Sequence, residues 1–121
     1  MIDMDPINRF KNVFLKMIVE KKITKPEGEE LYLSEDDDIK CRLEKNIIRL
    51  NQAIDLFVSA ESNRDELAMR AALLDIRVFM MSIYGVFYQS VGDIDFFIKE
   101  TKELSFPEDY QVPEHYNYRG E

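Results

Sequence analysis

The stretch from Asn63 to Ser90 constrains the fold most, because its periodicity predicts one long helix with apolar side chains on two sides. The first apolar face holds Leu67, Ala71, Leu74, Val78, Met81 and Gly85. The second, wider face holds Met69, Ala72, Leu73, Ile76, Phe79, Met80, Ile83 and Phe87. A helix that is apolar on both sides needs cover on both sides, so we expect it in the middle of a bundle or at a subunit interface.

Two narrow polar strips separate these faces. One strip holds Arg70, Arg77, Tyr84 and Tyr88, and the other holds Asp75, Ser82 and Gln89. Arginine and tyrosine are enriched among the residues that contribute most to protein interfaces, so we predict that the first strip belongs to a partner or dimer surface. Asp75 lies between two apolar faces and is predicted to form an ion pair or a hydrogen bond with an arginine or tyrosine of a neighbouring helix, with Arg42 and Arg49 as the candidate arginines.

Three further helices are expected around this one. The first runs from Pro6 to about Lys22 with Asp5 as its N-cap, and its apolar stripe is Ile7, Phe10, Val13, Phe14, Met17 and Ile18. A second begins at Ser34, where a capping serine precedes acidic residues, and carries the stripe Ile39, Leu43, Ile47, Leu50, Ile54, Phe57 and Val58. Val91, Gly92 and Asp93 are expected to break the long helix, and Asp93 to cap a short fourth helix that ends near Leu104.

Together these elements predict an all-α fold, a three- to four-helix antiparallel bundle formed by residues 1–104. A capping signature between Ser62 and Asp65 marks the short turn that makes two of the helices antiparallel. Residues 105–121 contain two prolines and no periodicity, which predicts an extended acidic and aromatic tail. Aromatic residues are unusual in a merely disordered end, so we expect Tyr110, Tyr116 and Tyr118 to contact a protein partner.

The formal net charge of −8 is concentrated in two acidic segments. Residues 27–44 hold eight acidic and two basic residues, and residues 93–121 hold eight acidic and three basic residues. Such a chain repels phosphate, so we expect no direct nucleic-acid binding and favour a basic protein partner. The acid run Glu35, Asp36, Asp37 and Asp38 is predicted either to stabilise a helix start or to bind that partner, because consecutive acids lack the spacing of a calcium loop.

The sequence offers no arrangement of reactive side chains that predicts catalysis, a metal site or a cofactor. A helical hydrolase that uses magnesium needs pairs of glutamates on facing helices, whereas Glu27 and Glu30 fall in a connection with Pro26 and Gly28. His115 lies in the tail without a helical arginine partner, and Cys41 has no histidine near it in sequence. We therefore expect a protein that is not an enzyme.

Three features favour the cytoplasm. A single cysteine rules out an internal disulfide framework, and the first residues lack the basic and apolar regions of a secretion signal. The longest apolar stretch, Val78 to Tyr88, has eleven residues, against the roughly 20 that a membrane-spanning helix needs. We therefore predict no membrane span and no membrane partner.

The function that fits these features is a non-enzymatic protein-binding module, regulatory or involved in assembly, that forms a homodimer through its central helix. One alternative is an acidic inhibitor of viral or mobile-element origin, which imitates nucleic acid and blocks the basic groove of a nucleic-acid enzyme. A second alternative is a metal-dependent nucleotide hydrolase.

Overall fold

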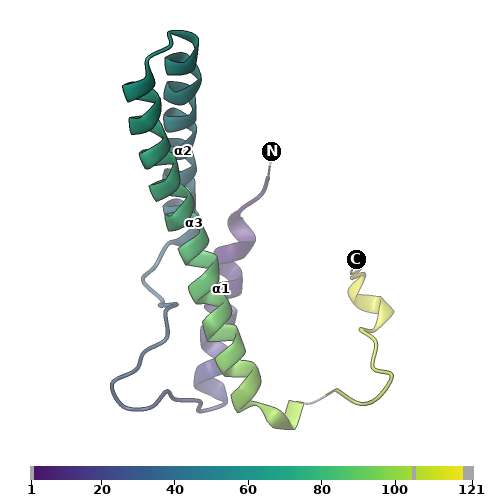
Figure 1. The fold of residues 1–121 in the computed structure, drawn as a ribbon. Coiled ribbons are helices and arrows are strands. Elements are labelled where there is room, and N and C mark those ends of the chain that lie inside the picture. Colours follow the sequence, from purple (N-terminus) through teal and green to yellow (C-terminus); the bar gives the residue numbers. More distant parts are fainter. Residues whose placement is uncertain (1, 105, 119–121) are drawn as a thin grey trace.

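The computed structural model describes residues 2–104 and 106–118, which contain helices and no strands (Figure 1). The three α-helices are α1, Asp5–Glu20, α2, Ile39–Ser62, and α3, Glu66–Glu100. Two short 3-10 helices follow, η1, Lys102–Leu104, and η2, Glu114–Tyr116. The predicted all-α class and the bundle are confirmed with three helices, and the fourth predicted helix is not a separate element.

α2 and α3 form an antiparallel hairpin, and α1 lies along the half of α3 that α2 leaves free (Figure 1). The turn between α2 and α3 is the predicted one. Asp65 caps α3, since its carboxylate accepts a hydrogen bond from the backbone N–H of Ala68 at 3.0 Å. With 35 residues and a rise of about 1.5 Å per residue, α3 is roughly 52 Å long.

The core lies where α1, the connection after it, the start of α2 and the C-terminal half of α3 meet. Its buried members are Phe14, Ile18, Leu33, Ile39, Leu43 and Val86. The rings of Phe14 and Phe97 meet edge-on with 5.5 Å between centroids, so α1 is joined to α3 through large side chains. Towards the α2–α3 turn the hairpin buries the alanines Ala53, Ala60 and Ala72, whose small side chains let the two helices approach closely.

The second helix begins at Ile39 and not directly after Ser34. Asp38 is its N-cap, and the Asp38 carboxylate accepts a hydrogen bond from the N–H of Cys41 at 3.0 Å. Ser34 instead opens a turn, in which its carbonyl accepts from the N–H of Asp37 at 3.3 Å. The acid run is thus a segment that precedes the helix, and the predicted helix start at Ser34 is wrong.

Long-range hydrogen bonds from α1 explain this difference. The Nζ of Lys11, a residue that is only 3% exposed, donates to the carbonyl oxygens of Glu35, at 3.1 Å, and Asp37. The side-chain oxygen of Asn8 accepts from the N–H of Ile39 at 3.0 Å. Carbonyls that accept from Lys11 point towards α1 and not along a helix axis, so the helix begins only after them.

α3 runs without interruption through Val91, Gly92 and Asp93, where the sequence predicted a break. Gly92 keeps helical geometry, and its cost there is conformational entropy alone. Asp93 is not a cap but a buried acceptor, 2% exposed, that receives hydrogen bonds from the N–H groups of Tyr32 at 3.1 Å and Leu33 at 2.8 Å. Its carboxylate therefore attaches the α1–α2 connection to the side of α3.

The N-terminal ends of α1 and α2 meet, and acidic side chains join them. Asp5 is the first residue of α1 and not its predicted N-cap, while Pro6 lies in the first turn as predicted. Asp5 pairs with Lys40 at 2.5 Å, and Asp38 accepts a hydrogen bond from the amide of Asn8 at 2.9 Å. These contacts stabilise the charged carboxylates and hold the pKa of both aspartates below the ordinary value. The negative charges also offset two positive helix-dipole ends.

Candidate functional site

The first apolar face of the long helix is exposed in the folded chain. We call this row the outer seam, and its members are Leu67, Ala71, Leu74, Val78, Met81 and Gly85. Leu67 is 82% exposed, and Leu74, Val78 and Met81 are each more than half exposed. A continuous apolar row over about five helical turns is typical of a docking surface.

α1 and α2 pack against part of the second, wider face of α3. Ala72 of that face and the adjoining Val86 are buried, and Ile76, Phe79 and Ile83 are half-buried, whereas Leu73, Met80 and Phe87 of the same face are 51%, 52% and 46% exposed. α1 and α2 lie one after the other along the same side of α3 (Figure 1). The periodicity predicted that both faces need cover, and one copy of the chain covers part of the wider face and leaves the outer seam exposed.

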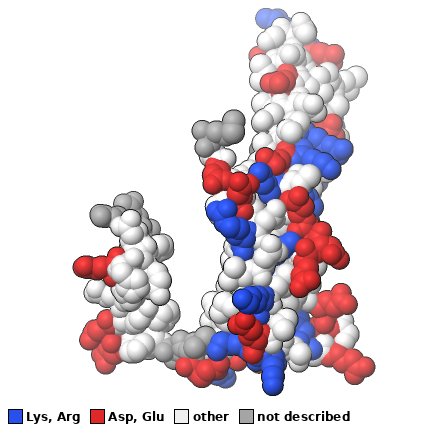
Figure 2. All heavy atoms as spheres, turned by 180° about the vertical axis from the view of Figure 1, so that it is seen from behind, with Lys and Arg blue, Asp and Glu red and all other residues white. Residues whose placement is uncertain are grey.

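Charged side chains are also few on the surface of α2 near the α2–α3 turn. Seen from behind, its upper part presents mainly uncharged side chains (Figure 2). The large apolar residues of α2 that are exposed are Ile47, Ile48, Ile54, Leu56 and Val58. The half of the hairpin near the α2–α3 turn is therefore a two-helix layer without a third helix over it.

The predicted binding strip borders the outer seam on the side of α3 that points away from α2. Its members Arg70, Arg77, Tyr84 and Tyr88 are all exposed. The two tyrosine rings lie 5.4 Å apart between centroids and form one aromatic surface. Neither arginine has an ion-pair partner among the described residues, so both guanidinium groups are accessible to another molecule. That the strip binds a partner stays a prediction.

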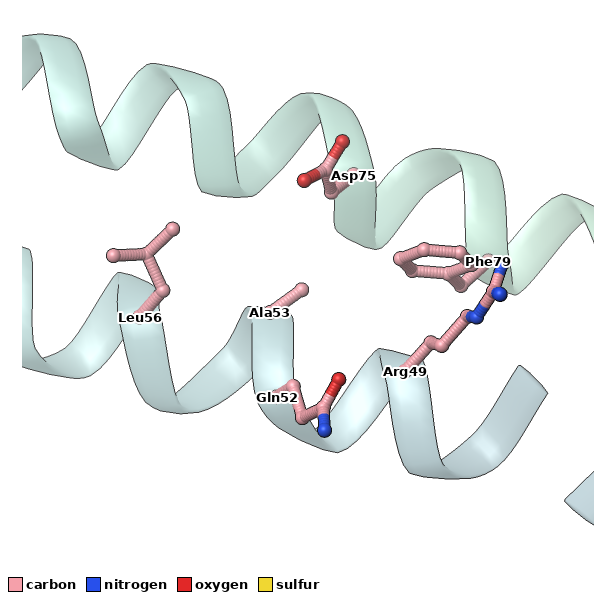
Figure 3. Close-up of a pocket in the computed structure, with 6 residues that line it drawn as sticks. All are labelled: Arg49, Gln52, Ala53, Leu56, Asp75 and Phe79. Atoms are coloured by element: carbon pink, nitrogen blue, oxygen red, sulfur yellow. The ribbon is translucent and has the colours of Figure 1, made fainter. Parts of the chain in front are cut away.

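Asp75 lies on the other border of the outer seam. It lines a shallow hollow of about 370 Å³ between α2 and α3, together with Arg49, Gln52, Ala53, Leu56 and Phe79 (Figure 3). In Figure 3 Asp75 lies across from Ala53, whereas the guanidinium of Arg49 lies beside Phe79, one turn away. This offset leaves the carboxylate without an ion pair in the part of the chain that the structure describes, and the predicted pairing with Arg42 or Arg49 is wrong.

Arg42 has other partners. It pairs with Asp37, and its guanidinium lies over the ring of Tyr32, 5.5 Å from the centroid. Its Nε is buried and has no hydrogen-bond partner among the described residues. Arg42 forms one wall of a second hollow of about 400 Å³, which is also lined by Tyr32, Asn46, Met81, Ser82, Gly85, Val86 and Gln89. This hollow opens beside the C-terminal end of the outer seam.

The acid run divides into an internal half and an exposed half. Asp37 pairs with Arg42, and Asp38 caps α2. Glu35 and Asp36 are exposed, and their carboxylates have no partner among the described residues. Binding of a basic protein by the run stays a prediction, and it concerns mainly these two residues.

The backbone of the tail, residues 106–118, lies away from the three helices (Figure 1). Tyr110, Tyr116 and Tyr118 are all about half exposed or more. The ring of Tyr110 lies 5.3 Å from that of Phe106, and the ring of Tyr116 lies 4.2 Å from that of His115. These ring contacts are local, and a role of the three tyrosines in partner binding stays a prediction.

Reactive side chains do not gather in the described ranges. No group of three or more His, Cys, Asp or Glu residues there is placed to hold a metal ion. Cys41 is a free, partly buried thiol near the start of α2, and His115 lies in η2. Within these ranges the candidate site is therefore built on the exposed apolar outer seam.

α3 is long and apolar enough to cross a membrane, by length and composition alone. A stretch of this helix has a mean hydropathy of 1.5, and only 11% of that stretch is buried. The eleven-residue apolar stretch that begins after Arg77 is part of an uninterrupted helix of 35 residues. Both a protein surface and a lipid surface are able to cover such a helix.

Comparisons with protein-family models, with curated proteins and with solved structures give no match to this chain. The candidate site is therefore defined by its own geometry. It consists of the outer seam, the exposed arginines and tyrosines on one border, and the hollows beside Asp75 and Gly85 on the other.

Proposed function

We propose that this protein is a non-enzymatic binding module that attaches to another protein through the outer seam of α3, with a second copy of itself as one partner. The observation that supports this proposal is the row of exposed leucine, valine and methionine side chains on a well-formed helix. Exposed apolar area costs about 25 cal/mol per Å², and a complementary protein surface removes that cost.

A protein surface fits this row better than a bilayer does. Arg70, Asp75 and Arg77 lie on the borders of the seam, within the same stretch of α3, and a charge at the centre of a membrane helix costs about 2.5–3.5 kcal/mol on insertion scales. α2, which packs against the same helix, adds the charges of Lys45 and Arg49. At a protein interface such charges stay hydrated at the rim or pair with the partner. The proposal therefore keeps a cytoplasmic location without a membrane partner.

Glutamate substitutions in the seam test this proposal. The seam variant combines Leu74→Glu with Val78→Glu, and the control Val19→Glu changes an apolar residue of α1 that is 73% exposed. Light scattering of the purified proteins measures self-association, and co-purification from the native host measures other partners. We expect the seam variant to lose partners that the wild type and the control retain, with unchanged circular dichroism. Equal binding by all three proteins would refute the proposal.

The acidic inhibitor is a second candidate, because the carboxylates of Glu35 and Asp36 are exposed. A salt-sensitive complex with a basic nucleic-acid enzyme would support it. Neutralising Glu35 and Asp36 together should abolish that complex and leave the cap formed by Asp38 intact. A complex that survives this change would count against the inhibitor.

A further inference from the structure

The spacing of the outer seam is that of a two-helix interface. From Leu67 to Gly85 its members are separated alternately by four and three residues, which keeps one row facing a partner helix. In heptad notation Leu67, Leu74 and Met81 occupy d positions, and Ala71, Val78 and Gly85 occupy a positions. Within parallel coiled coils, leucine at d with a β-branched residue at a, as in Leu74 and Val78, favours two helices over three or four.

The residues that border the seam select the orientation of the partner. Arg70, Arg77 and Tyr84 occupy g positions, and Asp75, Ser82 and Gln89 occupy e positions. In a parallel pair each g residue lies beside the e residue five positions later on the other helix. Arg70 then lies beside Asp75 of the partner subunit, and twofold symmetry produces this contact between opposite charges twice.

An antiparallel pair brings like charges together. With the two seams fully overlapped, g positions face g positions, so Arg77 approaches Arg77 of the partner subunit near the twofold axis. Asp75 likewise approaches Asp75 of the partner subunit, and both contacts are repulsive. In one copy none of Arg70, Asp75 and Arg77 has an ion-pair partner within the described residues. The parallel arrangement pairs Arg70 with Asp75 and separates the like charges.

From this complementarity we infer that the outer seam binds a second copy of the chain, with the two α3 helices parallel and in register. The inference rests on the proposed function and names the partner of that surface. The space beside Gly85 is open, because no neighbouring group in the described part of the chain lies within 4 Å of an added Cβ, and this lets the helices approach. In this register Tyr84 of the partner subunit lies beside Gln89, at the hollow of about 400 Å³ that Arg42 also lines. The hollow provides room for the tyrosine ring.

Charge exchange at the inferred pair tests the partner and the register. Arg70→Asp makes both contacts acidic, Asp75→Arg makes both basic, and each single variant should raise the dimer dissociation constant about tenfold. The double variant restores both contacts. An equimolar mixture of the two single variants forms a heterodimer with opposite charges at both contacts. Sedimentation equilibrium measures these constants, with Lys16→Asp on α1 as the control for net charge.

A cysteine at the tip of the hairpin tests the orientation independently. Leu67 is 82% exposed, so Leu67→Cys in a Cys41→Ser background is not expected to disturb the fold. A parallel pair brings the two introduced thiols into one layer, within the roughly 7 Å between Cα atoms that a disulfide allows. An antiparallel pair places Leu67 opposite Gly85, so the two thiols lie about 27 Å apart along the helix. Oxidised glutathione is expected to give a covalent dimer.

The opposing outcomes separate this inference from the proposed function. A dimer that forms no covalent link, or that ignores both single charge exchanges, overturns the parallel pairing alone. If the wild type is a strict monomer at high micromolar concentration, the parallel pairing is refuted. If the seam variant of that monomer still loses another protein partner, the proposed function is retained. A monomer that floats with phosphatidylcholine–phosphatidylglycerol vesicles and binds no protein overturns both.

Discussion

Replacing Asp93 by alanine removes the acceptor for two backbone N–H groups of the connection between α1 and α2. The carboxylate is 2% exposed and accepts from Tyr32 at 3.1 Å and from Leu33 at 2.8 Å. Leu33 is itself only 3% exposed, so water does not readily replace the lost acceptor. The variant leaves a buried donor unsatisfied and detaches the connection from α3.

The expected loss is about 2–4 kcal/mol in the free energy of unfolding. A hydrogen bond to a charged group contributes about 1.5–3 kcal/mol, and an unsatisfied buried donor costs about 1–3 kcal/mol. Tyr32 is half-buried, so its N–H regains part of its bond from water and the two contributions do not add fully. Against a total stability of about 5–15 kcal/mol this is a large fraction, and it lowers Tm by about 10 °C.

Urea unfolding followed by circular dichroism, at one fixed protein concentration, measures this difference. Asp95→Ala is the matched control, because Asp95 is an exposed carboxylate two residues later on the same helix, and its loss should cost less than about 0.5 kcal/mol. Asp93→Asn should recover only part of the stability, since an amide offers one acceptor oxygen in place of two. Equal urea midpoints for Asp93→Ala and Asp95→Ala would refute the reasoning.

Three other changes test separate parts of the fold. Gly92→Ala should stabilise the protein by about 0.5–1 kcal/mol in urea unfolding, because α3 is helical there and the space beside Gly92 is open; destabilisation would contradict a continuous helix. Lys11→Met removes the donor to two carbonyls and should cost about 1–3 kcal/mol, with faster hydrogen exchange over residues 35–38; unchanged exchange would disprove this role. The lowered pKa of Asp5 and Asp38 means that their contribution to stability is complete above about pH 4 and is lost as the pH falls below it. Urea midpoints at about pH 6 and about pH 3 measure this loss, which Asp5→Asn should reduce, and an identical pH profile for the variant would argue against the Asp5–Lys40 contribution.

Local patterns in the sequence were sufficient to predict that the three α-helices exist, though not all of their ends, and to predict the turn between the two longest of them. Apolar residues at spacings of three and four repeat within each helix, and a capping carboxylate acts over three residues, as Asp65 does on Ala68. Such interactions reach about one helical turn, so they can be read along the chain. The all-α class and the two apolar faces of α3 could therefore be predicted from such local interactions.

Helix ends that depend on distant residues could not be predicted in this way. The start of α2 was misplaced because Lys11, 24 positions before Glu35, binds the carbonyls that an earlier helix would use. The break near Gly92 was wrong because Asp93 accepts hydrogen bonds from residues 60 and 61 positions earlier and does not cap a new helix. In each case the sequence allowed a local hydrogen bond that would end or begin a helix, but the structure contains a buried hydrogen bond between residues far apart in sequence. Burial strengthens such a long-range hydrogen bond.

The candidate site likewise has features that local sequence patterns determine and features that only the tertiary structure determines. Periodicity alone determined that α3 has two apolar faces and which arginines, tyrosines and acids border them. Only the tertiary structure decided that the outer seam stays open, because α1 and α2 both pack against the part of the wider face that holds Ile76, Phe79 and Ile83, and these side chains bury more apolar area than Ala71 and Gly85 can. The exposed outer seam thus follows from a competition between two faces of one helix, and local periodicity cannot rank those faces.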